Sequence, residues 1–286
     1  MRRINLTRVP PEPLFILGST SQFVGQAVAV DLFDELTPGG VALLRVLGAA
    51  LMIVALRRSW QRRWTAIELR WASVFGIVLA AMNLSIYYSV ELVPLGNAVS
   101  IEFLGPVAVA AFGTRTLRSA AALSLAVAGV VVLAGVETGG TLRGVWFALL
   151  AGSFWAGYIV LGHRLARGAA WVDGLGVGMF VGALVISPFG IPHVPTAFRQ
   201  PALLGLGLLV ALLSNVVPYG LDQWVMRRID RNRFALLQAL APVTAAVVGF
   251  VMLSQEPSAR EMIGIGLVIV AILLSRSTDR TVAAPG

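Results

Sequence analysis

A glutamate and a proline inside one of the most apolar stretches of the chain are the residues best placed to do chemistry. In "IEFLGPVAVAAF", Ile101 to Phe112, Glu102 precedes Pro106 by four residues. Proline lacks an N–H, so it leaves the carbonyl of the residue four positions earlier without its helical partner. A carboxylate in bilayer hydrocarbon costs a further ~2.5–3.5 kcal/mol on insertion scales. Both costs fall at one place, which indicates a water-accessible cavity where Glu102 can carry a proton or bind an ammonium group.

The second half of the chain repeats this pattern. In "LLQALAPVTAAVVGF", Leu236 to Phe250, Gln238 precedes Pro242 by the same four residues. Interrupted spans at matching positions of two halves are the best sequence indication of a transport site. We therefore expect Gln238 and the helix breaks at Pro106 and Pro242 to lie at the same cavity as Glu102.

Glu102 also has a purely structural interpretation. Arg45 lies deep in a predicted span, and intramembrane charges usually pair whatever their role. The two interpretations, ion pair with Arg45 or place in a substrate or proton pathway, overlap if Arg45 and a substrate compete for Glu102. Asp222 lies one turn from Arg227 and Arg228, so we expect it to form an interfacial ion pair.

Polar and aromatic residues recur at matching positions of the two halves. Asn83-x3-Tyr87 matches Asn215-x3-Tyr219, and "SQFVGQAV" from Ser21 matches "SFWAGYIV" from Ser153. The candidate cavity-lining residues are Gln22, Asn83, Tyr87, Trp155, Asn215 and Tyr219. The alternative for the aromatic residues is packing or an interfacial belt, and for the amides a hydrogen bond between neighbouring helices.

Composition identifies the class of protein. The 286 residues are 57% hydrophobic and only 13% charged, with a mean hydropathy of +0.84. Soluble domains average about a quarter charged residues. Apolar runs recur at about the 20 residues that a helix needs to cross ~30 Å of hydrocarbon. The sequence therefore predicts an all-α polytopic membrane protein with the lipid bilayer as its surroundings.

The same composition argues against several other functions. No cysteine is present, so disulfides and thiolate metal sites are excluded. His163 and His193 fall in predicted loops, and no nucleophile, base and orienting group come together. We therefore expect no enzyme, no metal and no cofactor. The net charge of +8 comes from arginines between spans, as cytoplasmic loops require, so a nucleic-acid partner is not expected.

Ten spans are predicted between the charged clusters. They cover residues 14–30, 38–56, 70–91, 95–112, 119–136, 144–162, 172–190, 201–226, 234–253 and 261–275. Placing both termini in the cytoplasm puts most arginines inside, in the connections after the second, fourth, sixth and eighth spans, which follows the positive-inside rule. The first span resembles a secretory signal, but it is longer than a signal core, so we expect it to remain.

The matches between the halves predict two repeats of five spans, residues 1–140 and 141–286. Because five is odd, the second copy must enter the membrane upside down. Inverted repeats are typical of secondary transporters, whose substrate site lies near the repeat interface. Spans 119–136 and 261–275 carry small residues at close-packing spacing, so we expect them to form scaffold or homodimer contacts.

At these residues the sequence resembles the EamA type of the drug/metabolite transporter superfamily, and within it the threonine/homoserine exporter branch. The resemblance rests on "MNLSIYYSVELVPLGNAVSIEFLGPVAVAAFGTR", Met82 to Arg115, and extends through "LSNVVPYGLD" to "LLQALAPVTAAVVG". It implies ten helices around a central cavity in a bacterial inner membrane, and proton-driven efflux of small amino acids such as threonine and homoserine. Gln238-Ala239-Leu240 stands where related exporters often have Met and Glu, which leaves Glu102 as the candidate proton carrier.

The runner-up function is a carrier of the same fold for another metabolite, an aromatic amino acid or a drug. A phosphorylated substrate would favour several buried cations, and only Arg45 qualifies. Nucleotide-sugars are therefore disfavoured.

Overall fold

A computed structural model describes residues 10–112, 117–134, 141–168, 170–229, 234, 237–238, 241–256 and 258–275. Helices dominate these residues, and no strand occurs among them. The main helices are α1 (Pro11–Val30), α2 (Phe33–Arg57), α3 (Ala66–Val90), α4 (Leu95–Glu102), α5 (Leu104–Phe112), α6 (Leu117–Ala134), α7 (Thr141–Ala166), α8 (Trp171–Gly190), α9 (Val194–Arg199), α10 (Pro201–Ala211), α11 (Val217–Met226), α13 (Ala241–Leu253) and α14 (Ala259–Ser275). A π-helical turn, η4 (Leu212–Val216), joins α10 to α11.

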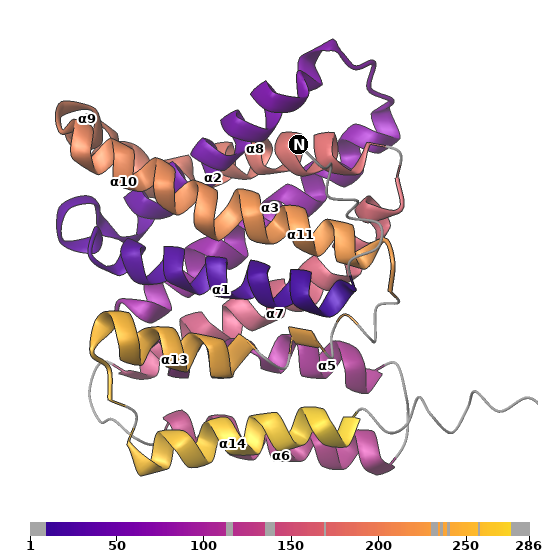
Figure 1. The fold of residues 1–286 in the computed structure, drawn as a ribbon, viewed down its shortest axis with the longest axis vertical. Helices are drawn as coiled ribbons and strands as arrows, with labels where there is room; N and C mark the ends of the chain where they lie inside the picture. Colours follow the sequence, from indigo (N-terminus) through magenta and orange to yellow (C-terminus); the bar gives the residue numbers. More distant parts are fainter. Residues whose placement is uncertain are drawn as a thin grey trace, which may run out of the picture.

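The long helices run roughly side by side in a stack of layers (Figure 1). One end of the stack is formed by α6 and α14, which pack on each other, and the other end by α2 and α8. Between them, α3 packs on α7 and α8, while α1 packs on α11 and α13. Because helices satisfy their backbone hydrogen bonds internally, they can lie against lipid over their outer faces.

Six helical segments in the described part of the chain are long and apolar enough to cross a membrane. They are α1, α2, α3, Leu142–Ala166 of α7, α8, and the segment Pro201–Met226 formed by α10, η4 and α11. Shorter apolar helices cover Leu95–Val109, Ala120–Gly129 and Val243–Leu253. The chain is therefore a multi-pass helical membrane protein, as composition predicted.

The helices bear on two sequence predictions. The span expected over 95–112, with its break near Glu102 and Pro106, is two helices, because α4 ends at Glu102 and α5 begins at Leu104. Pro106, lacking an N–H, cannot continue the hydrogen-bond pattern there. His163 was expected in a loop but lies buried in α7, which continues to Ala166.

The small residues of α6 and α14 face an intramolecular contact. Ala122 of α6 and Ala271 of α14 are both fully buried, and these two helices pack on each other. Small side chains allow two backbones to approach closely in lipid. This contact agrees with the scaffold role that the sequence predicted, and the alternative homodimer contact stays a prediction.

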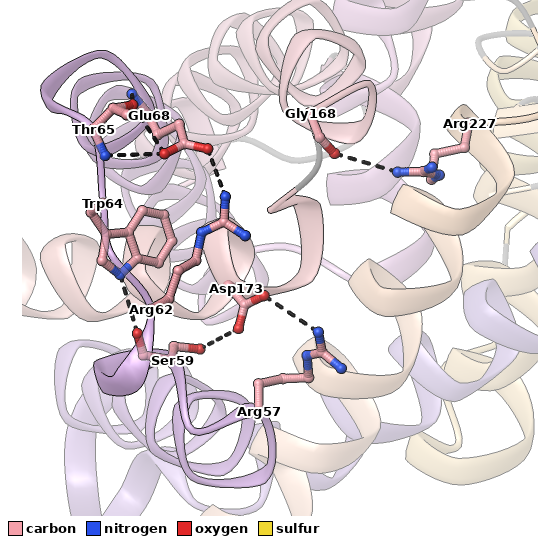
Figure 2. A network of polar contacts seen from close by, with 9 residues as sticks. All are labelled: Arg57, Ser59, Arg62, Trp64, Thr65, Glu68, Gly168, Asp173 and Arg227. Atoms are coloured by element: carbon pink, nitrogen blue, oxygen red, sulfur yellow. Dashed lines mark hydrogen bonds and ion pairs between the residues drawn. The ribbon is translucent and has the colours of Figure 1, made fainter.

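A polar network ties several helix ends together at one end of the molecule (Figure 2). Asp173, in the first turn of α8, pairs with Arg57 at 3.4 Å and accepts a hydrogen bond from Ser59 at 2.7 Å. Thr65 and Glu68 form a capping box that begins α3, which satisfies otherwise unpaired N–H groups of its first turn. The ends of α2, α3 and α8 thus meet in one charged cluster.

Further arginines join this end of the bundle. Arg62 pairs with Glu68 at 2.7 Å, and Arg227, just after α11, donates to the Gly168 carbonyl at 3.4 Å (Figure 2). Arg164 near the end of α7 lies over the Trp71 ring, 3.7 Å from its centroid. The arginines that follow α2, α7 and α11 therefore gather at the same end, which we call the arginine-rich end.

Candidate functional site

Glu102 lies where the fourth predicted span breaks. It is the last residue of α4, and Phe103 forms the turn before α5. Gly152 of α7 approaches so closely that an added Cβ would stand 2.5 Å from the Glu102 carbonyl oxygen. That carbonyl is the one left without a helical partner by Pro106. The absence of a side chain at Gly152 is what allows α7 to cover the break.

The Glu102 side chain is buried among the described residues without a hydrogen bond from any of them. The residue is 6% exposed, and its carboxylate accepts no hydrogen bond from the residues that the structure describes. A buried carboxylate is expensive in a membrane protein unless it serves a function, as a carboxyl that exchanges protons or binds a cation does.

The expected ion pair between Glu102 and Arg45 is not formed. The salt bridges in the described part of the chain are Arg57–Asp173 and Arg62–Glu68. The Arg45 guanidinium is close enough for its charge to act on Glu102, but its hydrogen bonds go elsewhere. Glu102 is thus available to a third, positively charged partner.

Arg45 of α2 is fully buried and contacts both η4 and α3. Its Nη2 donates to the Ser214 carbonyl at 3.0 Å, and its Nε donates to the Asn215 side-chain oxygen. The guanidinium lies over the ring of Tyr87, 4.9 Å from the centroid. Arg45, Tyr87, Ser214 and Asn215 therefore form one cluster, the Arg45 cluster, built from α2, α3 and η4.

A second proline explains why Arg45 finds an open carbonyl. Pro218 follows Ser214 by four residues, so the Ser214 carbonyl loses its helical partner as that of Glu102 does. The chain widens into a π-helical turn at this place, and such turns are frequent at functional sites. Ser214 is the site residue that sequence reasoning missed. The signal was present, because Ser214-x3-Pro218 repeats the spacing of Glu102-x3-Pro106.

Several polar atoms of the Arg45 cluster are buried without a hydrogen-bond partner among the described residues. They are Nη1 of Arg45, the hydroxyl of Tyr87, Nδ2 of Asn215 and Oγ of Ser214. A buried polar group without a partner costs ~1–3 kcal/mol. All four can donate a hydrogen bond. A carboxylate among them would satisfy these groups and neutralise Arg45.

Three further candidate residues are Asn83, Tyr219 and Trp155. Tyr219 donates to the Asn83 side-chain oxygen at 3.4 Å, so the two matched asparagine–tyrosine motifs meet. Trp155 of α7 packs edge-on against Phe103, with ring centroids 5.6 Å apart. The tryptophan therefore lies next to the break that follows Glu102.

The remaining candidates are less closely tied to this cluster. Gln238 is buried and Gln22 is half-buried, and neither forms a hydrogen bond with the Arg45 cluster in the described residues. Pro242 is the second residue of α13, as Pro106 is the third residue of α5, and residues 239–240 before α13 lie outside the described residues. A further interruption of the second half, which the sequence did not predict, lies at Ser214 and Pro218, one span earlier.

Asp222 is not the interfacial ion pair that the sequence predicted. It is 6% exposed and accepts a hydrogen bond from the Tyr158 hydroxyl at 3.0 Å. Arg227 donates instead to backbone carbonyls at Ala166 and Gly168. The position of Asp222 on α11 turns it toward α7, away from the helix end.

Known proteins resemble this chain over nearly its full length. The EamA-like transporter family matches residues 142–277. Threonine/homoserine exporter RhtA of Escherichia coli strain K12 is 32% identical over 275 residues, which are 94% of this chain and 92% of that protein. The protein of the same name from Salmonella typhimurium strain LT2 is 31% identical over the same shares.

A solved structure supports the fold alone. It is described only as the crystal structure of a protein and superposes with a TM-score of 0.64 at 17% identity, covering 95% of this chain and 99% of the other. Together with the buried charges in a multi-pass helical bundle, the full-length relatives determine the assignment. The chain belongs to the EamA-like transporter family of the drug/metabolite transporter superfamily, on its threonine/homoserine exporter branch, and is not an enzyme.

Proposed function

We propose that this protein is a secondary active transporter that exports small neutral amino acids of the threonine and homoserine kind in exchange for protons. In this proposal Glu102 binds the substrate ammonium group or a proton, one at a time. The single observation that carries it is the Glu102 carboxylate, buried without a hydrogen bond in the described structure beside the Arg45 cluster.

The substrate class follows from the two charged ends of the site. An amino acid is a zwitterion, which needs a negative group for its ammonium and donors for its carboxylate. Glu102 supplies the first, and the unpartnered donors of Arg45, Asn215 and Tyr87 supply the second. The names of the 32%- and 31%-identical relatives, threonine/homoserine exporters, favour a small polar side chain between these ends.

The packing of the helices supports two five-span repeats, residues 1–140 and 141–286. Exchanging each helix of the first half for its counterpart in the second turns the contact of α3 with α7 into that of α11 with α1. It likewise turns α3 with α8 into α10 with α2, and α5 with α7 into α13 with α1. The contacts α2 with α8 and α6 with α14 are unchanged. This pattern is the one expected of ten spans related by a two-fold axis.

The location of the arginines supports an orientation. The arginine-rich end gathers the connections that follow α2, α7 and α11. Cytoplasmic connections retain positive charge, so we place this end and both termini in the cytoplasm of a bacterium. The substrate then leaves from the opposite end.

Exchange of labelled substrate tests the proposed site. In liposomes loaded with unlabelled threonine and held at equal pH, we expect the wild-type protein to accumulate labelled threonine and homoserine. Glu102→Gln removes the charge for the ammonium group and nearly keeps the side-chain volume, so exchange should fall at least ~10-fold, or about 1.4 kcal/mol of binding.

The matched control is Glu91→Gln. Glu91 is exposed between α3 and α4, so this variant should exchange like the wild type. Size-exclusion profiles and circular dichroism would establish that each variant inserts and folds. Normal exchange by folded Glu102→Gln would contradict the role assigned to Glu102. If the wild type exchanged no small amino acid, the proposed substrate class would be wrong.

A further inference from the structure

Asp222 is a second buried acid that the proposed substrate site does not use. It lies in the middle of α11 and is 6% exposed. Charged side chains inside membrane helices are expensive and face the bundle interior or a water-filled space. An acid retained at such a position is therefore a candidate for ion or proton transfer.

The hydrogen bonding of Asp222 leaves one oxygen open. Its Oδ2 accepts from the Tyr158 hydroxyl at 3.0 Å. Its Oδ1 accepts no hydrogen bond from the described residues. Oδ1 is therefore open to a proton, as a proton-accepting carboxylate requires.

Asp222 lies between the substrate site and the arginine-rich end. It is seven residues from Asn215 and five from Arg227, which places it about two turns from the first and about one and a half from the second. Arg227 donates to the Ala166 carbonyl at the end of α7. A proton moving from the site toward the arginine-rich end would pass the level of Asp222.

Tyr158, which donates to Asp222, packs against Tyr219 of the proposed central site. The rings of Tyr158 and Tyr219 lie 5.5 Å apart, and Tyr219 donates to Asn83 at 3.4 Å. The Tyr219 hydroxyl interacts electrostatically with both Glu102 and Asp222. Tyr219 thus lies within the field of both buried acids.

Unpartnered polar groups near Asp222 could bind ordered water. Both ends of the Gln223 amide, next to Asp222, are buried without a partner among the described residues. The Ser19 hydroxyl of α1, a helix that packs on α11, is in the same situation. Buried polar groups of this kind commonly hold water, which can carry a proton where side chains do not touch.

Among the titratable and charged groups on the helices that pack against α11, Tyr158 is the one that contacts Asp222. On α7, Arg143, His163 and Arg164 lie in the turns near its two ends, and only Tyr158 contacts the carboxylate. The single charged residues of α1 and α8 are Glu12 and Asp173, each in its first turn. The turn η4 carries none.

We infer that Asp222, held by Tyr158, is a proton-binding carboxyl that passes protons between the central site and the cytoplasmic water. The Asp222 carboxylate takes up a proton from the central site and becomes a carboxylic acid. It then releases that proton to water on the cytoplasmic side and becomes a carboxylate again. The Tyr158 hydroxyl can both donate and accept, so it turns from donor to acceptor when Asp222 is protonated. The inference rests on the proposed proton exchange.

Separate measurements of exchange and of proton-driven transport test this role. Exchange of threonine for threonine needs only the substrate-loaded protein to reorient, whereas transport driven by a pH gradient also needs protons to leave. We expect Asp222→Asn to keep exchange within about 2-fold of the wild type and to lose gradient-driven accumulation by at least about 10-fold. Asp222→Glu should restore much of that accumulation, and Glu91→Gln should behave as the wild type.

A spectroscopic measurement distinguishes a proton carrier from a structural residue. Infrared difference spectra between acidic and alkaline pH should contain a carboxylic-acid band that Asp222→Asn lacks and Glu91→Gln keeps. Tyr158→Phe, which preserves packing, should shift the frequency of that band. Loss of exchange together with gradient-driven transport in folded Asp222→Asn would contradict the inference, and so would an unchanged infrared spectrum.

The outcomes also distinguish this inference from the proposed function. Gradient-driven accumulation that survives Asp222→Asn while wild-type transport is proton-coupled would overturn the role of Asp222 alone. Exchange by the wild type with no response to a pH gradient would overturn the proton coupling, and the role of Asp222 with it.

Discussion

At the scale of the residue, the site depends on charges that are left open. Arg45 donates hydrogen bonds to Asn215 and to the Ser214 carbonyl, and its Nη1 has no partner among the described residues. Glu102 accepts no hydrogen bond within the described part of the chain, although the charge of Arg45 acts on it. A direct ion pair would have neutralised both groups, so without it both charges stay available to a zwitterionic ligand.

A prediction for Arg45 follows from its geometry. Arg45→Lys keeps the charge but loses the planar fork that bonds Asn215 and the Ser214 carbonyl at once. We expect the apparent KM for threonine exchange to rise about 10-fold or more, with a folded protein. Arg63→Lys, at an exposed position, is the matched control and should leave the KM unchanged. An unchanged KM in Arg45→Lys would show that the fork does not bind substrate.

At the scale of the element, most helices could be predicted from the sequence. The breaks within the helices could be predicted only in part. Apolar runs between arginines predicted α2, α3 and α8 to within a few residues, because hydrocarbon thickness fixes their length. The break at Glu102 was predicted from Pro106. The counterpart break at Pro242 stays a prediction, because residues 239–240, just before α13, lie outside the described residues. The π-helical turn before Pro218 was not predicted.

The identity of side-chain partners could not be predicted from spacing alone. Asp222 was expected to pair with Arg227 on its own helix, but it pairs with Tyr158, 64 residues away along the chain. Such contacts depend on how helices rotate about their axes, which packing of neighbouring helices sets. The backbone approach of α4 and α7 at Gly152 has the same origin.

The close backbone contact of α4 and α7 at Gly152 leads to a prediction about stability. Gly152→Ala would place a methyl group 2.5 Å from the Glu102 carbonyl oxygen. The backbones must separate to admit it, and overpacking of this kind costs about 1–3 kcal/mol. We expect a lower melting temperature in detergent and weaker threonine exchange.

The matched control for Gly152→Ala is Gly205→Ala on α10. An added Cβ at Gly205 meets no atom within 4 Å, and alanine favours a helix over glycine by about 1 kcal/mol. This variant should melt at the wild-type temperature or above it. If Gly152→Ala melts as high as Gly205→Ala, the close contact at the break is wrong.

At the scale of the whole molecule, charge and packing indicate one orientation. The arginines after α2, α7 and α11 meet at one end of the bundle, although they lie far apart in the sequence. The helix contacts keep their pattern when the two halves are exchanged. Both features support the proposed inverted repeats.

The chain contains no cysteine, so single cysteines test this orientation cleanly. Gln61, between α2 and α3, and Gln200, between α9 and α10, are both exposed. In intact cells, a membrane-impermeant maleimide should label Gln200→Cys and not Gln61→Cys. Inverted membrane vesicles should show the opposite. Labelling of Gln61→Cys in intact cells would place the arginine-rich end outside.

The central claim, that Glu102 couples amino-acid movement to protons, is tested most directly by recording both fluxes together. Liposomes that contain a pH-sensitive dye and the wild-type protein would receive labelled threonine on one side of a preset pH gradient. The account predicts that protons move opposite to threonine, and that folded Glu102→Gln shows neither flux. Proton movement that continues in step with threonine in Glu102→Gln would contradict it.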